Sequence, residues 1–294
     1  MPTPTLLVTG GSSYLGHYLL PAAAEQFNLV AACHTHPQNI LAGKSVSFDL
    51  TNQADVRRVI TQLRPQAIIH AAAINPGQGD AARMTAVNTE GSRFVAQAAA
   101  EVGARLVHVS TDVVHDGHHA PYSDDAPPAP LNDYGRSKAA AEAAVLAACP
   151  QAAVVRISLI YGLSRMDRGT AGFVQRLESG QTLTLWRDVL RQPVWAESLA
   201  AALLKLVNLD FAGTLNVAGR QVLTREEFGR KMLAWWNVDP AGRLESGRAA
   251  GKYNSVPLDL RLRVERAESL LGMRLPGVDE VLETAPANRL HGQF

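Results

Sequence analysis

The chain has 294 residues, 47% of them hydrophobic, which is enough apolar material for one large domain or two closely joined parts. Its 28 basic and 27 acidic residues leave a formal charge of +1, so no overall charge attracts it to nucleic acid or to a membrane surface. The start of the chain lacks the pattern of a signal peptide, no segment has the length and hydrophobicity of a membrane span, and Cys33 and Cys149 show no metal-ligand spacing. We therefore expect a cytoplasmic protein with no nucleic-acid, membrane or metal partner.

Short β-rich segments alternate with alanine-rich segments along the first half of the chain. In chain order we expect strands at 5–10, 29–33, 45–49, 67–73, 105–110 and 153–158, and helices at 14–27, 52–63, 80–102 and 133–148. This alternation is typical of βαβ units, so it predicts an α/β fold with a Rossmann-like, doubly wound parallel sheet. The carboxyl ends of such strands share one edge of the sheet, where ligands bind.

The alternation breaks after Ser158. Residues 159–188 mix glycine, arginine and short apolar runs, the segment 214–219 is typical of one more strand, and the tail from Leu223 is rich in helix formers. The pattern predicts a main domain over 1–158 that also takes up the returning strand at 214–219. The segments 159–213 and 220–294 would form a smaller C-terminal part.

A glycine-rich turn, "VTGGSSYLGHYLL", joins the first strand to the first helix. This context favours a dinucleotide site, because the N-terminus of a helix offers unpaired N–H groups to a pyrophosphate. Gly10 would make the tight turn and Gly16 would allow close packing of the helix, but Ser13 replaces the glycine that lets backbone approach phosphate. Either the Ser13 hydroxyl itself contacts phosphate, or the turn has lost affinity for nucleotides.

The second strand ends in "AACHTHP" and carries no acidic residue there. A carboxylate at this place binds the ribose 2′-hydroxyl and repels a 2′-phosphate, so its absence favours NADP over NAD, which stays the alternative. His34 and His36 follow this strand and are candidates for a place near that phosphate.

Tyr134 and Lys138 are four residues apart at the start of an alanine-rich helix, so both side chains lie on one helix face. An ammonium about 4 Å from a phenol, at an effective dielectric near 20, supplies about 4 kcal/mol, enough to lower the phenol pKa from about 10 towards 7. Ser110 and Thr111 end a predicted strand at the ligand edge and offer hydroxyl groups to a carbonyl. The alternative is a tyrosine and a solvated lysine on a surface turn.

Several segments occur in the order and spacing of the extended short-chain dehydrogenases. They are "LLVTGGSSYLG", "FDLTNQADV", "AIIHAAA", "AVNTEGS", "LVHVSTDVVHDG", "NDYGRSKAAAE" and "VVRISLIYG". The chain resembles most the dTDP-4-dehydrorhamnose reductase branch, which also includes the regulatory β subunit of methionine adenosyltransferase. The resemblance implies an NAD(P)-binding Rossmann-like domain and a smaller substrate-binding part, and it leaves a homodimer open.

The resemblance also implies roles for single residues. Thr111, Tyr134 and Lys138 match the catalytic trio of the family, in which the tyrosine protonates the substrate oxygen as hydride arrives and the lysine holds the nicotinamide ribose. The residues that match cofactor-binding positions are Gly10, Ser12, Ser13, Tyr14, Leu15, Gly16, Asp49, Leu50, Ala71, Ala72, Ala73, Asn88, Tyr134 and Lys138.

Two functions stay open at this stage. The first is an NADP(H)-dependent reductase of a keto group on a nucleotide-linked sugar, favoured by the complete catalytic trio. The second is a non-catalytic, NADP-binding regulatory subunit. It is favoured by Ser13 in place of a glycine and by Val113, His115 and Leu159, which stand where the reductase branch has aromatic residues. An epimerase or dehydratase of the same superfamily is less favoured, because a dehydratase would need a carboxylate pair after Thr111 and Asp112 is followed by Val113.

Overall fold

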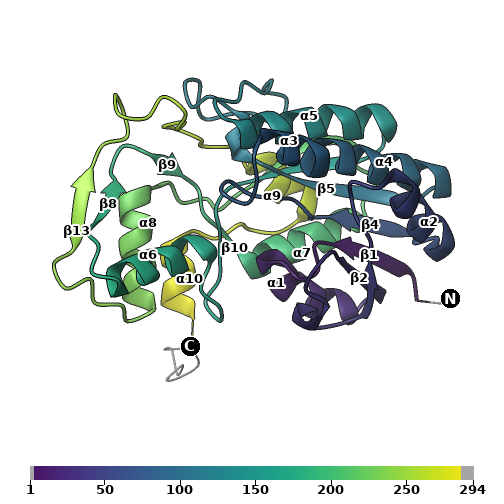
Figure 1. Ribbon diagram of the computed structural model, residues 1–294, viewed down its shortest axis with the longest axis horizontal. Helices are drawn as coiled ribbons and strands as arrows, with labels where there is room; N and C mark the ends of the chain where they lie inside the picture. Colours follow the sequence, from purple (N-terminus) through teal and green to yellow (C-terminus); the bar gives the residue numbers. More distant parts are fainter. Residues whose placement is uncertain (1–2, 286–294) are drawn as a thin grey trace.

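The computed structural model describes residues 3–285, and its centre is a seven-stranded parallel sheet (Figure 1). In spatial order the strands are β11 (Gly213–Val217), β6 (Ala153–Ile157), β5 (Arg105–Thr111), β4 (Ala67–His70), β1 (Thr5–Thr9), β2 (Asn28–Cys33) and β3 (Lys44–Ser47). All seven predicted strands are present, including the returning strand, which pairs with β6. The order reverses between β1 and β4, which is where ligands of doubly wound sheets bind.

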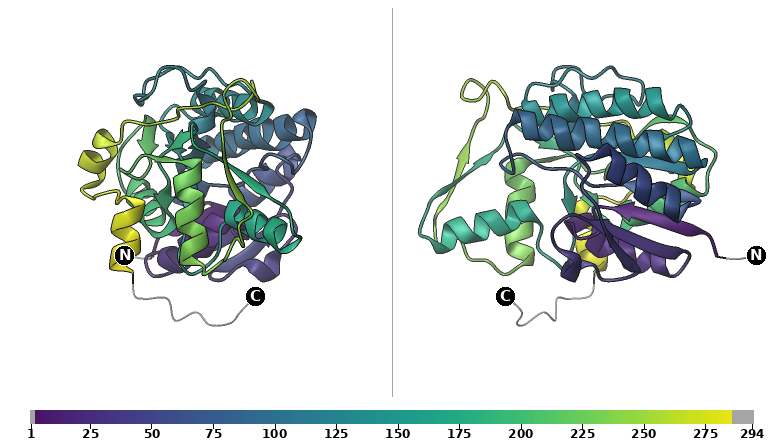
Figure 2. Two further views of the ribbon diagram at one scale, coloured as in Figure 1. Left: turned by 90° about the vertical axis from the view of Figure 1, so that its left-hand side faces the viewer. Right: turned by 45° about the vertical axis from the view of Figure 1, so that its right-hand side comes forward.

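Helices cover both faces of the sheet. One face carries α1 (Tyr14–Ala24), α7 (Ala196–Val207) and α9 (Glu265–Leu271), and the other carries α2 (Gln53–Leu63), α4 (Gly91–Val102) and α5 (Asp133–Ala148), which form a layer in Figure 2. The alternation of side chains along a strand serves both faces: in β1, Leu6 and Val8 join the core under α1 and α7, while Leu7 joins the core under α2 and α4.

The predicted helix at 80–102 is present as one run with a wider turn inside it. It begins as α3 (Ala81–Met84), passes through a π-helical turn, η2 (Thr85–Glu90), and continues as α4. Such turns are frequent at functional sites, and this one carries Asn88. Two 3₁₀ turns, η1 (Pro37–Asn39) and η3 (Asp112–Val114), follow β2 and β5.

The smaller part, on the left of Figure 1, contains α6 (Arg168–Glu178), α8 (Arg225–Trp235) and α10 (Val278–Thr284). Three short strand pairs accompany these helices: β7 (Ile160–Tyr161) with β10 (Val194–Trp195), β8 (Leu183–Trp186) with β13 (Leu244–Gly247), and β9 (Leu190–Arg191) with β12 (Leu223–Thr224). A separate apolar cluster around Tyr161, Phe228 and Met232 holds this part together.

Two helices that the sequence assigned to the smaller part pack against the sheet. Helix α7 contacts α1 and β5, and α9 contacts β11 and α7. Their apolar residues, such as Leu199 and Leu203, belong to the same core as Leu6. The division into two parts stays a proposal, and these contacts favour counting α7 and α9 with the main domain. Among residues 3–285, no helix is long and apolar enough to cross a membrane.

Candidate active site

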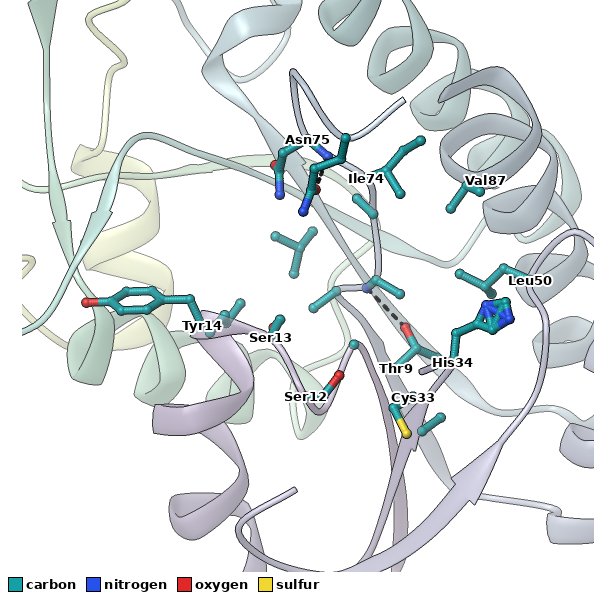
Figure 3. Close-up of a pocket in the computed structure, with 18 of the residues that line it drawn as sticks. Thr9, Ser12, Ser13, Tyr14, Cys33, His34, Leu50, Ile74, Asn75 and Val87 are labelled. Atoms are coloured by element: carbon teal, nitrogen blue, oxygen red, sulfur yellow. Dashed lines mark hydrogen bonds between the residues drawn. The ribbon is translucent and has the colours of Figure 1, made fainter. Parts of the chain in front are cut away.

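A cavity of about 500 Å³ opens where β1, β2, β4 and β5 end (Figure 3). The predicted site residues that line it are Gly10, Ser12, Ser13, Tyr14, Leu15, Asp49, Leu50, Ala71, Ala72, Ala73, Tyr134 and Lys138. The tertiary fold therefore brings together residues from four separate segments. Gly16, Asn88 and Thr111 do not line this cavity, but each forms a hydrogen bond with a residue that does.

The glycine turn at the base of the cavity depends on close backbone contacts. Gly10 has φ +75°, and a Cβ on it would lie 2.9 Å from the backbone N of Ala72. A Cβ on Gly16 would lie 2.2 Å from the carbonyl oxygen of Gly11, so α1 can approach the turn only because residue 16 is glycine. Ser13 is the N-cap of α1, where its Oγ accepts a hydrogen bond of 3.1 Å from the backbone N of Gly16. This capping role was not predicted from the sequence. It leaves the hydroxyl proton of Ser13 available to a ligand.

Asn88 fixes the loop that follows β4. Its Oδ1 accepts a hydrogen bond from the backbone N of Ile74 at 2.9 Å, and its Nδ2 donates to the carbonyl oxygen of Ile74 at 3.0 Å and to Ser137 Oγ at 3.0 Å. The predicted strand over 67–73 ends at His70, so Ala71, Ala72 and Ala73 belong to this loop. Asn88 thereby holds one wall of the cavity against α5.

Helix α5 places Tyr134 and Lys138 at the cavity. It begins with Asn132 as N-cap, whose Oδ1 accepts from the backbone N of Gly135 at 2.9 Å. A Cβ on Gly135 would lie 2.4 Å from the carbonyl oxygen of Val113, so the glycine lets the first turn of α5 rest on η3. This contact brings Tyr134 beside Thr111, the last residue of β5.

Lys138 is almost completely buried, with 2% of its surface exposed. Its Nζ donates to the carbonyl oxygen of Val109 at 2.8 Å and lies 3.4 Å from His108 Nε2. Burial lowers the pKa of Lys138 from 10.5 to about 8, and the nearby carboxylate of Glu142 opposes this change. Burial likewise lowers the pKa of His108, so this imidazole is neutral and accepts from the ammonium.

The prediction that Lys138 lowers the pKa of Tyr134 is wrong for this arrangement. Burial raises the pKa of Tyr134 to about 12, the charge of Asp112 raises it further, and only the Thr111 hydroxyl acts in the opposite direction. The reason is geometric: the ammonium of Lys138 is directed at a backbone carbonyl of β5, while a carboxylate lies on the side of the phenol. Tyr134 is therefore protonated at neutral pH.

A buried ion pair anchors α5 one turn beyond Lys138. Glu142 and Arg156, 4% and 3% exposed, pair at 2.8 Å, and Ser110 donates to the same carboxylate. Arg156 also donates to the carbonyl oxygen of Ala126 at 2.9 Å. These bonds join α5 to β5, β6 and the loop before α5.

Two arginines near the end of β5 were not predicted from the sequence as site residues. Arg191 lies on β9 with its Nε 3.9 Å from Asp112 Oδ2, and Arg225 begins α8 directly after β12. Burial lowers the pKa of both guanidinium groups, and the charge of Arg191 lowers the pKa of Arg225 further. Within residues 3–285 the Arg225 guanidinium makes no hydrogen bond or ion pair. The carboxylate of Asp112 acts on both guanidinium groups in the opposite direction.

The histidines after Asp112 have local partners. His115 is buried and stacks on Tyr122 with 3.9 Å between the ring centroids, and Asp116 accepts from the Tyr122 hydroxyl at 2.6 Å. In the part of the chain that the structure describes, no three His, Cys, Asp or Glu side chains gather as a metal site would require.

Comparison with known proteins identifies the family. The family model described as the RmlD substrate binding domain matches residues 4–284. The chain is 33% identical over 245 residues to a dTDP-4-dehydrorhamnose reductase of Mycobacterium tuberculosis, covering 80% of this chain and 76% of that protein. It is 31% identical to a dTDP-4-keto-6-deoxy-D-glucose reductase of Streptomyces niveus, with 85% of each protein covered.

Solved structures agree with this assignment. A crystal structure of dTDP-4-dehydrorhamnose reductase from Bacillus anthracis in complex with NADP has a TM-score of 0.77 and 25% identity, covering 96% of this chain and 98% of that one. A hypothetical dTDP-4-dehydrorhamnose reductase from Sulfolobus tokodaii has a TM-score of 0.80 and 27% identity, with 94% and 97% covered. The chain therefore belongs to the RmlD substrate binding domain family, within the extended short-chain dehydrogenases that its sequence resembles.

Proposed function

We propose that the chain is an oxidoreductase that uses NADP(H) to reduce a keto group on a nucleotide-linked sugar. The observation that carries the proposal is the meeting of Tyr134, Lys138 and Thr111 at the end of β5, at one end of a cavity built by a glycine turn. The names of the Mycobacterium tuberculosis and Streptomyces niveus relatives, both reductases of dTDP-linked keto sugars, support the substrate class.

The residues present fit an NADP-type cofactor. The turn at Gly10 and the N-terminus of α1 would face the pyrophosphate, and Leu50 lies at the end of the cavity opposite Tyr14 in Figure 3, where an adenine would fit. The buried ammonium of Lys138 would hold the nicotinamide ribose. The bound cofactor supplies the hydride.

Tyr134 is the proton donor of this proposal. With a pKa of about 12 it carries its proton at neutral pH, and an alkoxide formed from a reduced carbonyl is basic enough to take it. Thr111, whose hydroxyl acts on the same phenol, would orient the carbonyl oxygen. The raised pKa therefore suits the reductive direction.

Arg191 and Arg225 would bind the diphosphate of a nucleotide-linked sugar. Both lie near Asp112, which directly follows Thr111, so an anion held by them would place an attached sugar close to the catalytic hydroxyls. Leu159 packs into the core of the smaller part and gives no aromatic face to the sugar, which separates this site from that of the rhamnose branch.

NADPH oxidation with a panel of nucleotide-linked 4-keto sugars tests the proposal, with Tyr134→Phe as the test variant. Loss of the proton donor should lower kcat by at least about a hundredfold while the Kd for NADPH stays within threefold. Tyr161→Phe is the matched control, because the buried hydroxyl of Tyr161 makes no hydrogen bond with the described residues. Turnover that survives in Tyr134→Phe would refute the role of the phenol.

NADPH binding without turnover on any sugar would support the alternative, a regulatory NADP-binding subunit. This alternative is favoured by Val113, His115 and Leu159, which stand where the reductase branch has aromatic side chains. The cytoplasmic location and the homodimer stay predictions.

A further inference from the structure

The charges that line the cofactor cavity are few and unevenly placed. Among the described residues of its wall, the charged Asp, Glu, Lys and Arg side chains are Asp49, Arg83 and Lys138. Lys138 is buried beside Tyr134 at the end proposed for nicotinamide. The end proposed for adenosine, where His34 and Leu50 lie together in Figure 3, therefore contains Asp49 and Arg83 as its charged groups.

The carboxylate of Asp49 is already engaged. Its Oδ1 accepts hydrogen bonds from the backbone N of Thr51 at 2.9 Å and from Thr51 Oγ1 at 2.8 Å. These bonds lower the pKa of Asp49, and the charges of His34 and Arg83 contribute to the same direction. Arg83 and His34 therefore both lie close to the carboxylate of Asp49 at this end of the cavity.

Arg83 reaches the cavity from α3, far along the chain from the turn after β2. Asp80 caps α3 by accepting from the backbone N of Arg83 at 2.8 Å, which fixes the start of the helix. A Cβ on Gly79 would lie 3.1 Å from both Cβ and Cγ of Arg83, so the glycine leaves room for the arginine stem. Within residues 3–285, the Arg83 guanidinium makes no hydrogen bond and no ion pair.

We propose that Arg83 is the cation that pairs with the 2′-phosphate of NADP, with His34 as a second donor. The inference rests on the proposed use of NADP. It assigns recognition of the 2′-phosphate to α3, at the start of the helical run that contains the π-helical turn, and not to the end of β2. Arginine suits this role, because its guanidinium donates two parallel hydrogen bonds to phosphate oxygens.

The assignment explains how a β2 end without any lysine or arginine can favour a phosphorylated ribose. Residues 33–36 are Cys, His, Thr and His, which remove the carboxylate that would repel the phosphate but supply no permanent positive charge. A phosphate monoester carries close to two negative charges at neutral pH, and Arg83 is the permanent cation in the wall at that end.

Calorimetric titration of the full chain with two small nucleotides isolates this contact. Adenosine 2′,5′-bisphosphate and 5′-AMP differ only in the 2′-phosphate, so the ratio of their Kd values reports its recognition without turnover. The wild type should bind the bisphosphate at least about tenfold more tightly, and Arg83→Met should bring the ratio near one with the Kd for 5′-AMP within about twofold. His34→Gln should lower the ratio by a smaller factor.

Arg93→Met is the matched control, because Arg93 pairs with Glu90 at 2.6 Å and lies outside the cavity wall. Equal weakening of both nucleotides by Arg83→Met would overturn the inference, since the guanidinium would then serve the adenine or the 5′-phosphate. A wild-type ratio near one, or an unchanged ratio in Arg83→Met, would also overturn it. Failure of the wild type to bind either nucleotide or NADPH would overturn the proposed function as well, whereas loss of sugar reduction alone leaves this inference intact.

Discussion

Replacing the buried Lys138 should stabilise the fold. Lys138 is 2% exposed and has few partners: its ammonium donates to the carbonyl oxygen of Val109 and lies beside the neutral His108. A buried charge whose interactions are incomplete destabilises the folded state, even where function requires that charge. We therefore expect Lys138→Met to abolish reduction and to raise the free energy of unfolding at pH 7.

The size of the effect follows from the pKa. A fall from 10.5 to about 8, at about 1.4 kcal/mol for each pKa unit, corresponds to about 3 kcal/mol of destabilisation by the charged amine. The variant loses one hydrogen bond to Val109, which costs about 1–2 kcal/mol. The net gain should be about 1–2 kcal/mol, or a rise in Tm of roughly 2–5 °C for a chain of this size.

The gain in stability of Lys138→Met should become smaller as the pH rises. Because the folded-state pKa of Lys138 lies below the unfolded-state value of 10.5, the cost of its charge is fully present below pH 8. The cost disappears as the pH rises from about 8 to 10.5, since the folded state then loses its proton more readily than the unfolded state. The difference between Lys138→Met and the wild type should therefore shrink over this range.

Urea unfolding at pH 6.5, 8 and 9.5 measures this difference. Lys205→Met is the control, because Lys205 is an exposed lysine that also donates to a backbone carbonyl, that of Leu271. The control should show no gain in stability at any of these pH values. A Lys138→Met protein that is less stable than the wild type, or a gain that is constant with pH, would refute the reasoning.

Three further outcomes follow from the site. Glu142→Gln should lower the free energy of unfolding by about 3–5 kcal/mol in urea titrations, because it leaves the buried guanidinium of Arg156 without its partner; a change below 1 kcal/mol would contradict this. Gly16→Ala should raise the Kd for NADPH at least tenfold in calorimetry, because its Cβ would overlap the Gly11 carbonyl, and unchanged binding would contradict the tight turn. Arg225→Gln should raise the KM for the nucleotide-linked sugar by about tenfold or more in steady-state assays and leave the Kd for NADPH unchanged; equal effects on both would place this arginine elsewhere.

The sequence by itself predicted the strands and helices of the central sheet and many of the residues that line the cavity. Alternating β-rich and alanine-rich segments fixed the strands and helices, because period and propensity are local properties of the chain. The glycine turn and the Tyr134–Lys138 spacing were also readable, since a turn that needs Gly10 and a helix face that spans four residues are short-range features.

Only the tertiary structure decided the electrostatics and the contributions of distant segments. The sequence placed Lys138 near Tyr134, but burial and the direction of the ammonium set the phenol pKa, and these depend on β5 and Asp112. Arg191 and Arg225 meet only because β9 pairs with β12, and Arg83 joins the cavity wall only through the fold of the loop after β4. Helix α7 has an apolar face that could have packed on either part, and contact with α1 placed it on the sheet. Long-range packing, which no local pattern encodes, therefore determined the chemistry of the site.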